Sequence, residues 1–289
     1  MEPRIGFIGQ GWIGKNYADD FEQRGFATVR YGLEPEYAGN KDAIKDCGIV
    51  FIAVPTPTTQ AGFDDSALRA VLPLVGKGAT AVIKSTLLPG TTESLQEAFP
   101  DIVVLNSPEF LREANAAYDA AHPVRTFIGI PKDTPEHRAA ADAVLAVLPE
   151  SSYTRIVSAR EAELIKYAGN VFLALKVVYA NMLYDLAGKI GADYEVVKEG
   201  LAADPRIGAS HLSVMSASGH TTTPGRGAGG HCFIKDLEAL RRLYVSEVGD
   251  AAGAELLLAV VKKNNDLLTQ SGKDLDLLAG VYGKESSAL

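Results

Sequence analysis

Short apolar runs alternate with amphipathic helical stretches through the first half of the chain. Continuous apolar runs bounded by turn residues indicate buried strands, whereas apolar positions at helical spacing indicate helices that bury one face. The runs that predict strands cover residues 4–9, 27–32, 46–54, 79–84, 102–106, 126–130 and 153–157. One helical stretch follows the first of these runs and ends near residue 24. Three others cover residues 66–75, 91–99 and 135–148. This alternation predicts an α/β domain built on a mostly parallel sheet.

The pattern changes after residue 158. Residues 159–190 form one helical pattern with few breakers, longer than the usual ~8–20 residues, as expected of a helix that joins domains or subunits. Shorter helices are predicted at 193–202, 235–244 and 251–268, and a Gly-, Ser-, Thr- and Pro-rich loop at 204–230. We therefore expect an α/β domain over residues 1–158 and an all-α domain over 159–289.

Composition narrows the possible functions. The 289 residues carry a formal net charge of −8, which argues against a general nucleic-acid partner. The two cysteines, Cys47 and Cys232, imply no disulfide framework and suit a reducing cytoplasm. No uninterrupted apolar run approaches ~18 residues, so we expect no membrane span. The histidines lack the spacing of metal ligands, and no metal is predicted.

A glycine fingerprint follows the first predicted strand. Gly9-x-Gly11-x-x-Gly14 permits a tight turn, close approach of a pyrophosphate and close helix–strand packing. The same glycines also suit a turn without a ligand. The fingerprint favours a Rossmann-like domain that binds a dinucleotide through Gly9, Gly11, Trp12, Ile13 and Gly14. Glu34, twenty residues after Gly14, is the candidate ribose ligand or a solvated loop acid.

The cofactor and the loops after later strands leave alternatives open. Arg30 is able to accept a 2′-phosphate, although NAD is the better prediction than NADP. Two segments, Val54-Pro55-Thr56 and Ser85-Thr86, each come at the end of a predicted strand, at the edge where open α/β sheets bind ligands. Each is either a ligand contact or an ordinary turn between a strand and a helix. The segment Ser107–Glu113 carries Glu109 and Glu113 four residues apart. It is either a segment that holds the substrate, with one glutamate as a base, or a solvated helix start.

Polar side chains in the second half of the chain suit catalysis or the binding of an anionic ligand. Lys166 and Asn170 are one helical turn apart, so that their ammonium and amide groups could together stabilise an oxyanion. The pattern fits a lysine on the protein surface equally well. Arg206 either binds a carboxylate or phosphate group or is a solvated side chain. Cys232 lies in a predicted glycine-rich turn, Gly227 to His231, with Asp236 four residues later. A thiol in such a turn can attack a carbonyl carbon.

Taken together, these motifs resemble the UDP-glucose/GDP-mannose dehydrogenase family. The resemblance is collinear over nearly the whole chain and rests on the glycine fingerprint, Val54-Pro55-Thr56-Pro57, Ser85-Thr86 with Pro89-Gly90-Thr91, and Ser107-Pro108-Glu109-Phe110-Leu111-Arg112-Glu113. It continues through Lys166 with Asn170, Arg206-Ile207-Gly208, and Gly229-Gly230-His231-Cys232 with Lys235-Asp236.

The resemblance implies an NAD-dependent, four-electron oxidation of the C6 alcohol of a nucleotide sugar, UDP-glucose above all. Cys232 would carry a thiohemiacetal and then a thioester. The other implied catalytic residues are Lys166, Asn170, Asp236, Glu113 and Thr86. The implied cofactor ligands are the fingerprint residues with Glu34, Val54, Pro55, Thr56, Thr86 and Lys235. The implied substrate ligands are Glu109, Phe110, Leu111, Arg112, Glu113, Lys166, Asn170, Arg206, Gly229 and Cys232.

The resemblance also implies a cytoplasmic homodimer formed through the long helix. The family usually has a further C-terminal domain that binds the nucleotide, and this chain is expected to lack it. Two other functions stay open. A two-domain β-hydroxyacid dehydrogenase shares the length and a Lys-x-x-x-Asn helix but needs no cysteine. A non-catalytic cofactor-binding relative would need a partner domain.

Overall fold

The computed structural model describes residues 3–112 and 115–283. Two compact units comprise Met1–Pro57 with Asp64–Lys166, and Thr58–Phe63 with Tyr167–Leu289. The predicted boundary at residue 158 falls at the end of a strand. The boundary between these units instead falls after Lys166, within the following helix, and residues Thr58–Phe63 belong to the second unit.

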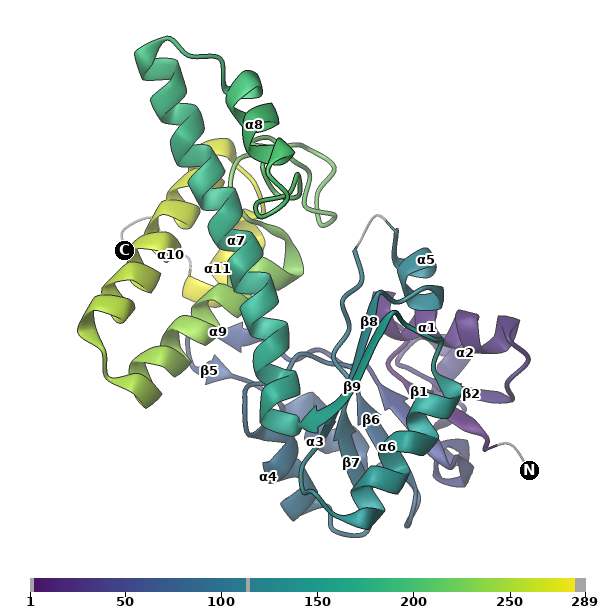
Figure 1. Ribbon diagram of the computed structural model, residues 1–289. Coiled ribbons are helices and arrows are strands. Elements are labelled where there is room, and N and C mark those ends of the chain that lie inside the picture. The colour runs from purple at the N-terminus through teal and green to yellow at the C-terminus, as the bar shows by residue number, and fades with distance from the viewer. Residues whose placement is uncertain (1–2, 113–114, 284–289) are drawn as a thin grey trace. The chain divides into compact units, whose positions relative to one another are not determined.

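The first unit is built on a seven-stranded sheet (Figure 1). The strand order is β2-β1-β3-β6-β7-β8-β9, and every pair is parallel except β7 with β8. The strands are β1 (Ile5–Ile8), β2 (Thr28–Tyr31), β3 (Ile49–Ile52), β6 (Thr80–Ile83), β7 (Val103–Asn106), β8 (Arg125–Ile130) and β9 (Tyr153–Ser158). The carboxyl ends of β1, β3, β6 and β7 share one edge, and β8 begins there because it is antiparallel to β7. This arrangement confirms the predicted α/β, Rossmann-like fold.

Burial on both faces explains why the central strands read as continuous apolar runs. Every residue of β1, β3, β6 and β7 is buried. Such strands need not alternate with polar positions, because helices cover both faces of a parallel sheet. Phe7, Phe21 and Phe51 pack together with ring centroids 5.2–5.4 Å apart, which fixes the first helix against β1 and β3.

Short helices connect these strands. They are α1 (Trp12–Gln23), α2 (Pro35–Ala38), α3 (Ser66–Val71), α4 (Thr91–Ala98), α5 (Ala116–Ala121) and α6 (Pro135–Val147), with 3-10 turns at Lys41–Asp46 and Leu72–Leu74. The α-helix predicted over 66–75 ends early, because Pro73 lacks the N–H that a continuing helix needs. The sequence did not predict α2, α5 or the turn at 41–46, which are too short for a clear helical period.

The second unit is helical. It contains most of α7 (Ala159–Ile190), followed by α8 (Tyr194–Ala203), α9 (Gly230–Val248), α10 (Ala251–Ser271) and α11 (Leu275–Tyr282). A hairpin of β4 (Thr58–Thr59) and β5 (Gly62–Phe63) joins them, tied by Arg242, which donates to the Thr59 carbonyl at 2.7 Å. The prediction of α7 is confirmed, but α9 begins at Gly230 and not near residue 235. Cys232 therefore lies in a helical turn, which corrects the predicted loop position.

Helix α7 also has the length and composition of a membrane-spanning helix. Its best 18-residue window has a mean hydropathy of 1.3, and 39% of that window is buried in the structure. A core helix of a globular protein passes the same test, so the expectation of no membrane span stays a prediction.

A buried carboxylate fastens the start of α7 to the sheet domain. Glu163 accepts hydrogen bonds from the Gly90 and Thr92 amides at 2.7 and 2.8 Å and from the Thr92 hydroxyl at 2.6 Å. It thereby caps α4, whose N-cap residue Gly90 has no side chain to do so. Burial raises the pKa of Glu163 from its ordinary 4.5 to about 7, although these hydrogen bonds act to lower it.

Removing this charge should change how stability depends on pH. The folded pKa lies above the unfolded one, so the free energy of unfolding should fall as pH rises from about 4.5 to 7. In Glu163→Gln we expect this fall to shrink by on the order of 2 kcal/mol. Urea denaturation at pH 5 and pH 8 measures it. The exposed Glu97→Gln on α4 is the control, and an unchanged pH dependence in Glu163→Gln would contradict the assignment.

Candidate active site

The glycine fingerprint forms a tight turn with one open side. Gly9 has φ +88°, and a Cβ there would lie 2.3 Å from the Ala53 carbonyl oxygen. A Cβ on Gly14 would lie 1.9 Å from the Gly9 oxygen. Gly11, the N-cap of α1, has nothing within 4 Å of such an atom and has no side-chain cap. The first turn of α1, with Trp12 and Ile13, therefore offers amides on an open face that suits a dinucleotide pyrophosphate.

The end of β2 carries the ribose candidate. Glu34 folds back so that its Oε2 lies 2.2 Å from where a Cβ on Gly32 would be, and Gln10 beside the fingerprint lies 3.2 Å from that point. A carboxylate in this place suits the hydroxyls of an adenosine ribose. Arg30, the candidate 2′-phosphate ligand, instead forms ion pairs of 2.7 Å with Asp19 and Glu22. These pairs favour NAD over NADP.

Two loops at the carboxyl edge are hydrogen-bonded to each other. The Thr56 hydroxyl donates to the Thr86 carbonyl at 2.7 Å, and the Ser85 hydroxyl donates to the Val54 carbonyl at 2.7 Å. Thr56 and Ser85 are buried, and Pro55 lies between the two contacts. The structure thus brings together the loops after β3 and β6 that the sequence singled out separately.

A buried ion pair lies after β7. The Lys166 ammonium donates to Glu109 Oε1 at 2.8 Å, and the Leu111 amide donates to Oε2 at 2.7 Å. Both side chains are about 4% exposed. Burial acts to raise the pKa of Glu109, but the Lys166 charge and these hydrogen bonds outweigh it and lower the pKa. Lys166 is therefore buried and paired with Glu109, which excludes the surface lysine that the sequence left open as an alternative.

The remaining residues of this segment differ in their surroundings. Arg112 forms an ion pair with Asp119 at 2.6 Å, and Phe110 packs under the Arg125 guanidinium at 4.0 Å from the ring centroid. Glu113, one of the implied catalytic residues, lies outside the described residues.

In the second unit, the candidate nucleophile lies at a helix start. Cys232 is exposed in the first turn of α9, whereas Cys47 is buried. Asp236, fully buried one turn later, accepts from Asn170 Nδ2 at 2.6 Å and from Lys235 Nζ at 2.6 Å. Asn170, which lies among apolar residues of α7, thus has a buried hydrogen-bond partner. Lys235, predicted to bind the cofactor, holds Asp236 in this structure.

The loop before Cys232 is held by side chains that the sequence did not single out. Asp274 accepts from the Gly230 amide at 2.7 Å and from the Ser218 hydroxyl at 2.8 Å. A Cβ on Gly229 would lie 2.1 Å from Asp274, so only glycine fits there. Asn264 holds the Ala228 amide and carbonyl at 2.7 and 3.0 Å. In the sequence, Asp274 and Asn264 could have been noticed only as polar residues near the end of an otherwise apolar helical pattern.

Arg206 is exposed and paired with Asp204 at 2.6 Å. In the described parts of the chain, no group of three or more His, Cys, Asp or Glu residues is arranged to hold a metal ion.

A methyl group on Gly11 should separate cofactor binding from folding. In Gly11→Ala the new Cβ points into open space, so we expect an unchanged melting temperature and NAD affinity weakened by at least about tenfold. Titration calorimetry measures the affinity. Gly39→Ala, also open and with φ −67°, is the matched control. Wild-type affinity in Gly11→Ala would exclude the fingerprint as the cofactor site.

The two cysteines should differ sharply in reactivity. We expect iodoacetamide to modify Cys232 in the native protein and Cys47 only after unfolding, because Cys47 is 2% exposed. Mass spectrometry of tryptic peptides over time follows both sites. Labelling of the two thiols at equal rates in the native protein would contradict the described positions.

Comparison with known proteins relates this geometry to a family. Residues 33–147 match the NAD binding domain of the UDP-glucose/GDP-mannose dehydrogenase family, and residues 160–266 match its central domain. The match to that domain supports NAD as the cofactor. UDP-glucose 6-dehydrogenase YwqF of Bacillus subtilis is 33% identical over 94% of this chain. This chain spans 60% of the length of YwqF.

Solved structures agree on the fold. A UDP-glucose dehydrogenase from Pyrobaculum islandicum superimposes with a TM-score of 0.76 at 28% identity, over 91% of this chain and 68% of that one. A 3-hydroxyisobutyrate dehydrogenase from Mycobacterium tuberculosis, at 16% identity and a TM-score of 0.69, covers 96% of this chain and 98% of its own, and shares the fold alone. With the NAD binding domain and the central domain matched in this order, the chain belongs to the UDP-glucose/GDP-mannose dehydrogenase family.

Proposed function

We propose that this protein oxidises the C6 alcohol of a nucleotide sugar, UDP-glucose above all, to the carboxylate in two NAD-dependent steps. One observation carries the proposal: Cys232 lies in the first turn of α9, one turn before the buried Asp236 that Asn170 holds at 2.6 Å. A dehydrogenase that transfers only one hydride needs no nucleophile beside such a carboxylate. The family's named relatives support the substrate class.

The first step converts the alcohol to an aldehyde. When bound, NAD supplies a hydride acceptor for each of the two oxidations. We propose that a water held by Asp236 and Lys166 takes the hydroxyl proton as the hydride leaves C6. Lys166 and Asn170, one turn apart on α7, stabilise the oxygen as it gains negative charge. Glu109, Phe110, Leu111 and Arg112 form the proposed sugar-nucleotide contact, with Gly229 beside Cys232.

The second step passes through a covalent intermediate. The Cys232 sulfur bonds to C6 of the aldehyde, and the carbonyl oxygen takes a proton to give a thiohemiacetal. Loss of the second hydride from C6, with the hydroxyl proton passing to water, leaves a thioester. Water then attacks C6, the C–S bond breaks, and Cys232 and the carboxylate are released, with Glu113 as the proposed base and Thr86 positioning the water. Covalent attachment keeps the aldehyde from escaping between the two oxidations.

Assembly and location are further parts of the proposal. Helix α7 exposes Phe172, Tyr179, Met182, Leu186 and Ile190 at helical spacing. Such an apolar stripe fits a second copy of the chain. We propose a cytoplasmic homodimer through α7 in which Arg206 of one copy reaches the sugar in the other, with residues 1–158 as the NAD domain and 159–289 as the helical dimer domain.

A one-step β-hydroxyacid dehydrogenase is the second candidate. The fold shared with 3-hydroxyisobutyrate dehydrogenase over nearly the full length of both chains favours it. It leaves Cys232 and Asp236 without a role, and we therefore rank it second.

Counting NADH distinguishes the two candidates. With purified protein, NAD and UDP-glucose, we expect two NADH per sugar consumed, followed by absorbance at 340 nm. Cys232→Ser should lose at least about 100-fold in overall turnover because no thioester forms, while Cys47→Ser keeps it. One NADH per sugar, or full turnover by Cys232→Ser, would overturn the covalent route. NAD binding without reduction by UDP-glucose or GDP-mannose would overturn the activity of this chain alone.

A further inference from the structure

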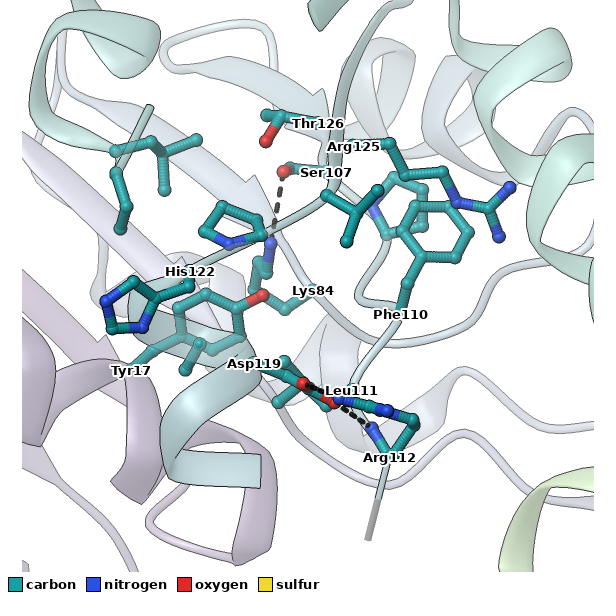
Figure 2. Close-up of a pocket in the computed structure, with 16 residues that line it drawn as sticks. Tyr17, Lys84, Ser107, Phe110, Leu111, Arg112, Asp119, His122, Arg125 and Thr126 are labelled. Atoms are coloured by element: carbon teal, nitrogen blue, oxygen red, sulfur yellow. Dashed lines mark hydrogen bonds and ion pairs between the residues drawn. The ribbon is translucent and has the colours of Figure 1, made fainter. Parts of the chain in front are cut away.

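A cavity of about 330 Å³ lies within the first unit, beside the segment that follows β7 (Figure 2). Its lining comes from α1, α5 and the start of β8, and from the residues that follow β6, β7, α5 and α6. The walls combine apolar side chains, among them Phe110, Leu111, Val124 and Leu148, with charged ones, among them Arg112, Asp119 and Arg125. None of its lining residues belongs to the glycine fingerprint or to the loops at Val54–Thr56 and Ser85–Thr86. It is thus separate from the proposed dinucleotide contacts.

Lys84 brings a buried amine to this cavity. Its side chain is only 4% exposed, and its Nζ lies 3.2 Å from the Ser107 hydroxyl and 4.4 Å from the centre of the Tyr17 ring. Figure 2 shows these three side chains converging on the same side of the cavity. A lysine ammonium has three N–H donors, and one hydroxyl and one ring face leave that capacity partly unused.

Among the described residues, no carboxylate lies within ion-pairing distance of Lys84. Glu109 acts on it electrostatically, but the Glu109 oxygens already accept from Lys166 and from the Leu111 amide. Burial lowers the pKa of Lys84 to about 7, Glu109 partly offsets this, and Lys166 adds to it. A buried ammonium with incomplete compensation gains most from an anion placed against it.

We propose that the cavity beside Lys84 binds a small monocarboxylate with an apolar body. Its carboxylate would accept hydrogen bonds from Lys84 Nζ and the Ser107 hydroxyl, and its apolar body would lie against Phe110 and Leu111. A neutral ligand would leave the lysine uncompensated, and a compact inorganic anion would leave the apolar walls in contact with water. Binding there does not require the proposed dehydrogenase activity, but Phe110 and Leu111 also belong to the proposed sugar-nucleotide contact, so the two ligands would share this wall.

Binding of such an anion takes up a proton at neutral and alkaline pH. Lys84 loses its charge as pH rises through about 7, so affinity for the anion should fall above that pH. The other charged or titratable groups that face this region are Tyr17 on α1, Asp119 and His122 on α5, Glu109 and Arg112 after β7, Arg125 on β8 and Lys166 on α7. Arg112 and Asp119 pair with each other, and Glu109 pairs with Lys166.

Benzoate and its uncharged analogue benzamide test the site by titration calorimetry on the full chain. We expect benzoate to bind at least about tenfold more tightly than benzamide at pH 6.5, and Lys84→Met to remove that preference. Lys132→Met, an exposed lysine of the same unit, is the matched control and should keep it. Saturating NAD should leave benzoate affinity unchanged, whereas competition would place benzoate at the cofactor site and overturn the assignment.

The wild-type protein gives a second, independent readout. Benzoate affinity should fall by about tenfold per pH unit above pH 7, with proton uptake seen as a buffer-dependent enthalpy. Equal affinity for benzoate and benzamide, or an affinity independent of pH between 6 and 9, would overturn the proposal even if Lys84→Met failed to fold. Because the titration needs neither NAD nor sugar, its result is separate from that of the turnover assay.

Discussion

The buried ion pair between Glu109 and Lys166 constrains the carboxyl edge of the first unit. Two charges taken out of water are stable only in close, fully hydrogen-bonded geometry, and here the ammonium and carboxylate are 2.8 Å apart with the Leu111 amide on the second oxygen. This requirement fixes the backbone after β7 against the start of α7. Glu163, three residues earlier on the helix, fixes the same stretch of α7 to the start of α4.

The same constraint determines what the neighbouring groups can do. With Glu109 committed to Lys166, Lys84 is left with a hydroxyl and an aromatic ring as its contacts, and its charge is poorly compensated. Lys166 in turn cannot leave its pocket without stranding Glu109. In the second unit, Asp236 has a comparable role, because it is fully buried and holds both Asn170 and Lys235. The polar groups of each unit are therefore preorganised by buried carboxylates.

The sequence predicted what local pattern encodes. The central strands were recognisable because they are buried on both faces, and α7 because few breakers interrupt its 32 residues. It could not predict partners distant in sequence, such as Asn170 with Asp236 or Gly230 with Asp274, which only the folded chain brings together. The start of α9 was placed too late because Gly229 and Gly230 indicate a loop, while the Asp274 carboxylate that caps the helix lies 44 residues away.

The coupling between Glu109 and Lys166 tests this account most directly. Urea unfolding of the wild type, Glu109→Gln, Lys166→Met and the double variant gives a double-mutant cycle. Each single change should cost about 3–5 kcal/mol because it strands a buried charge. The double variant should cost at least about 2 kcal/mol less than the sum of the single changes. Additive costs would show that the two charges do not depend on each other and would contradict the account.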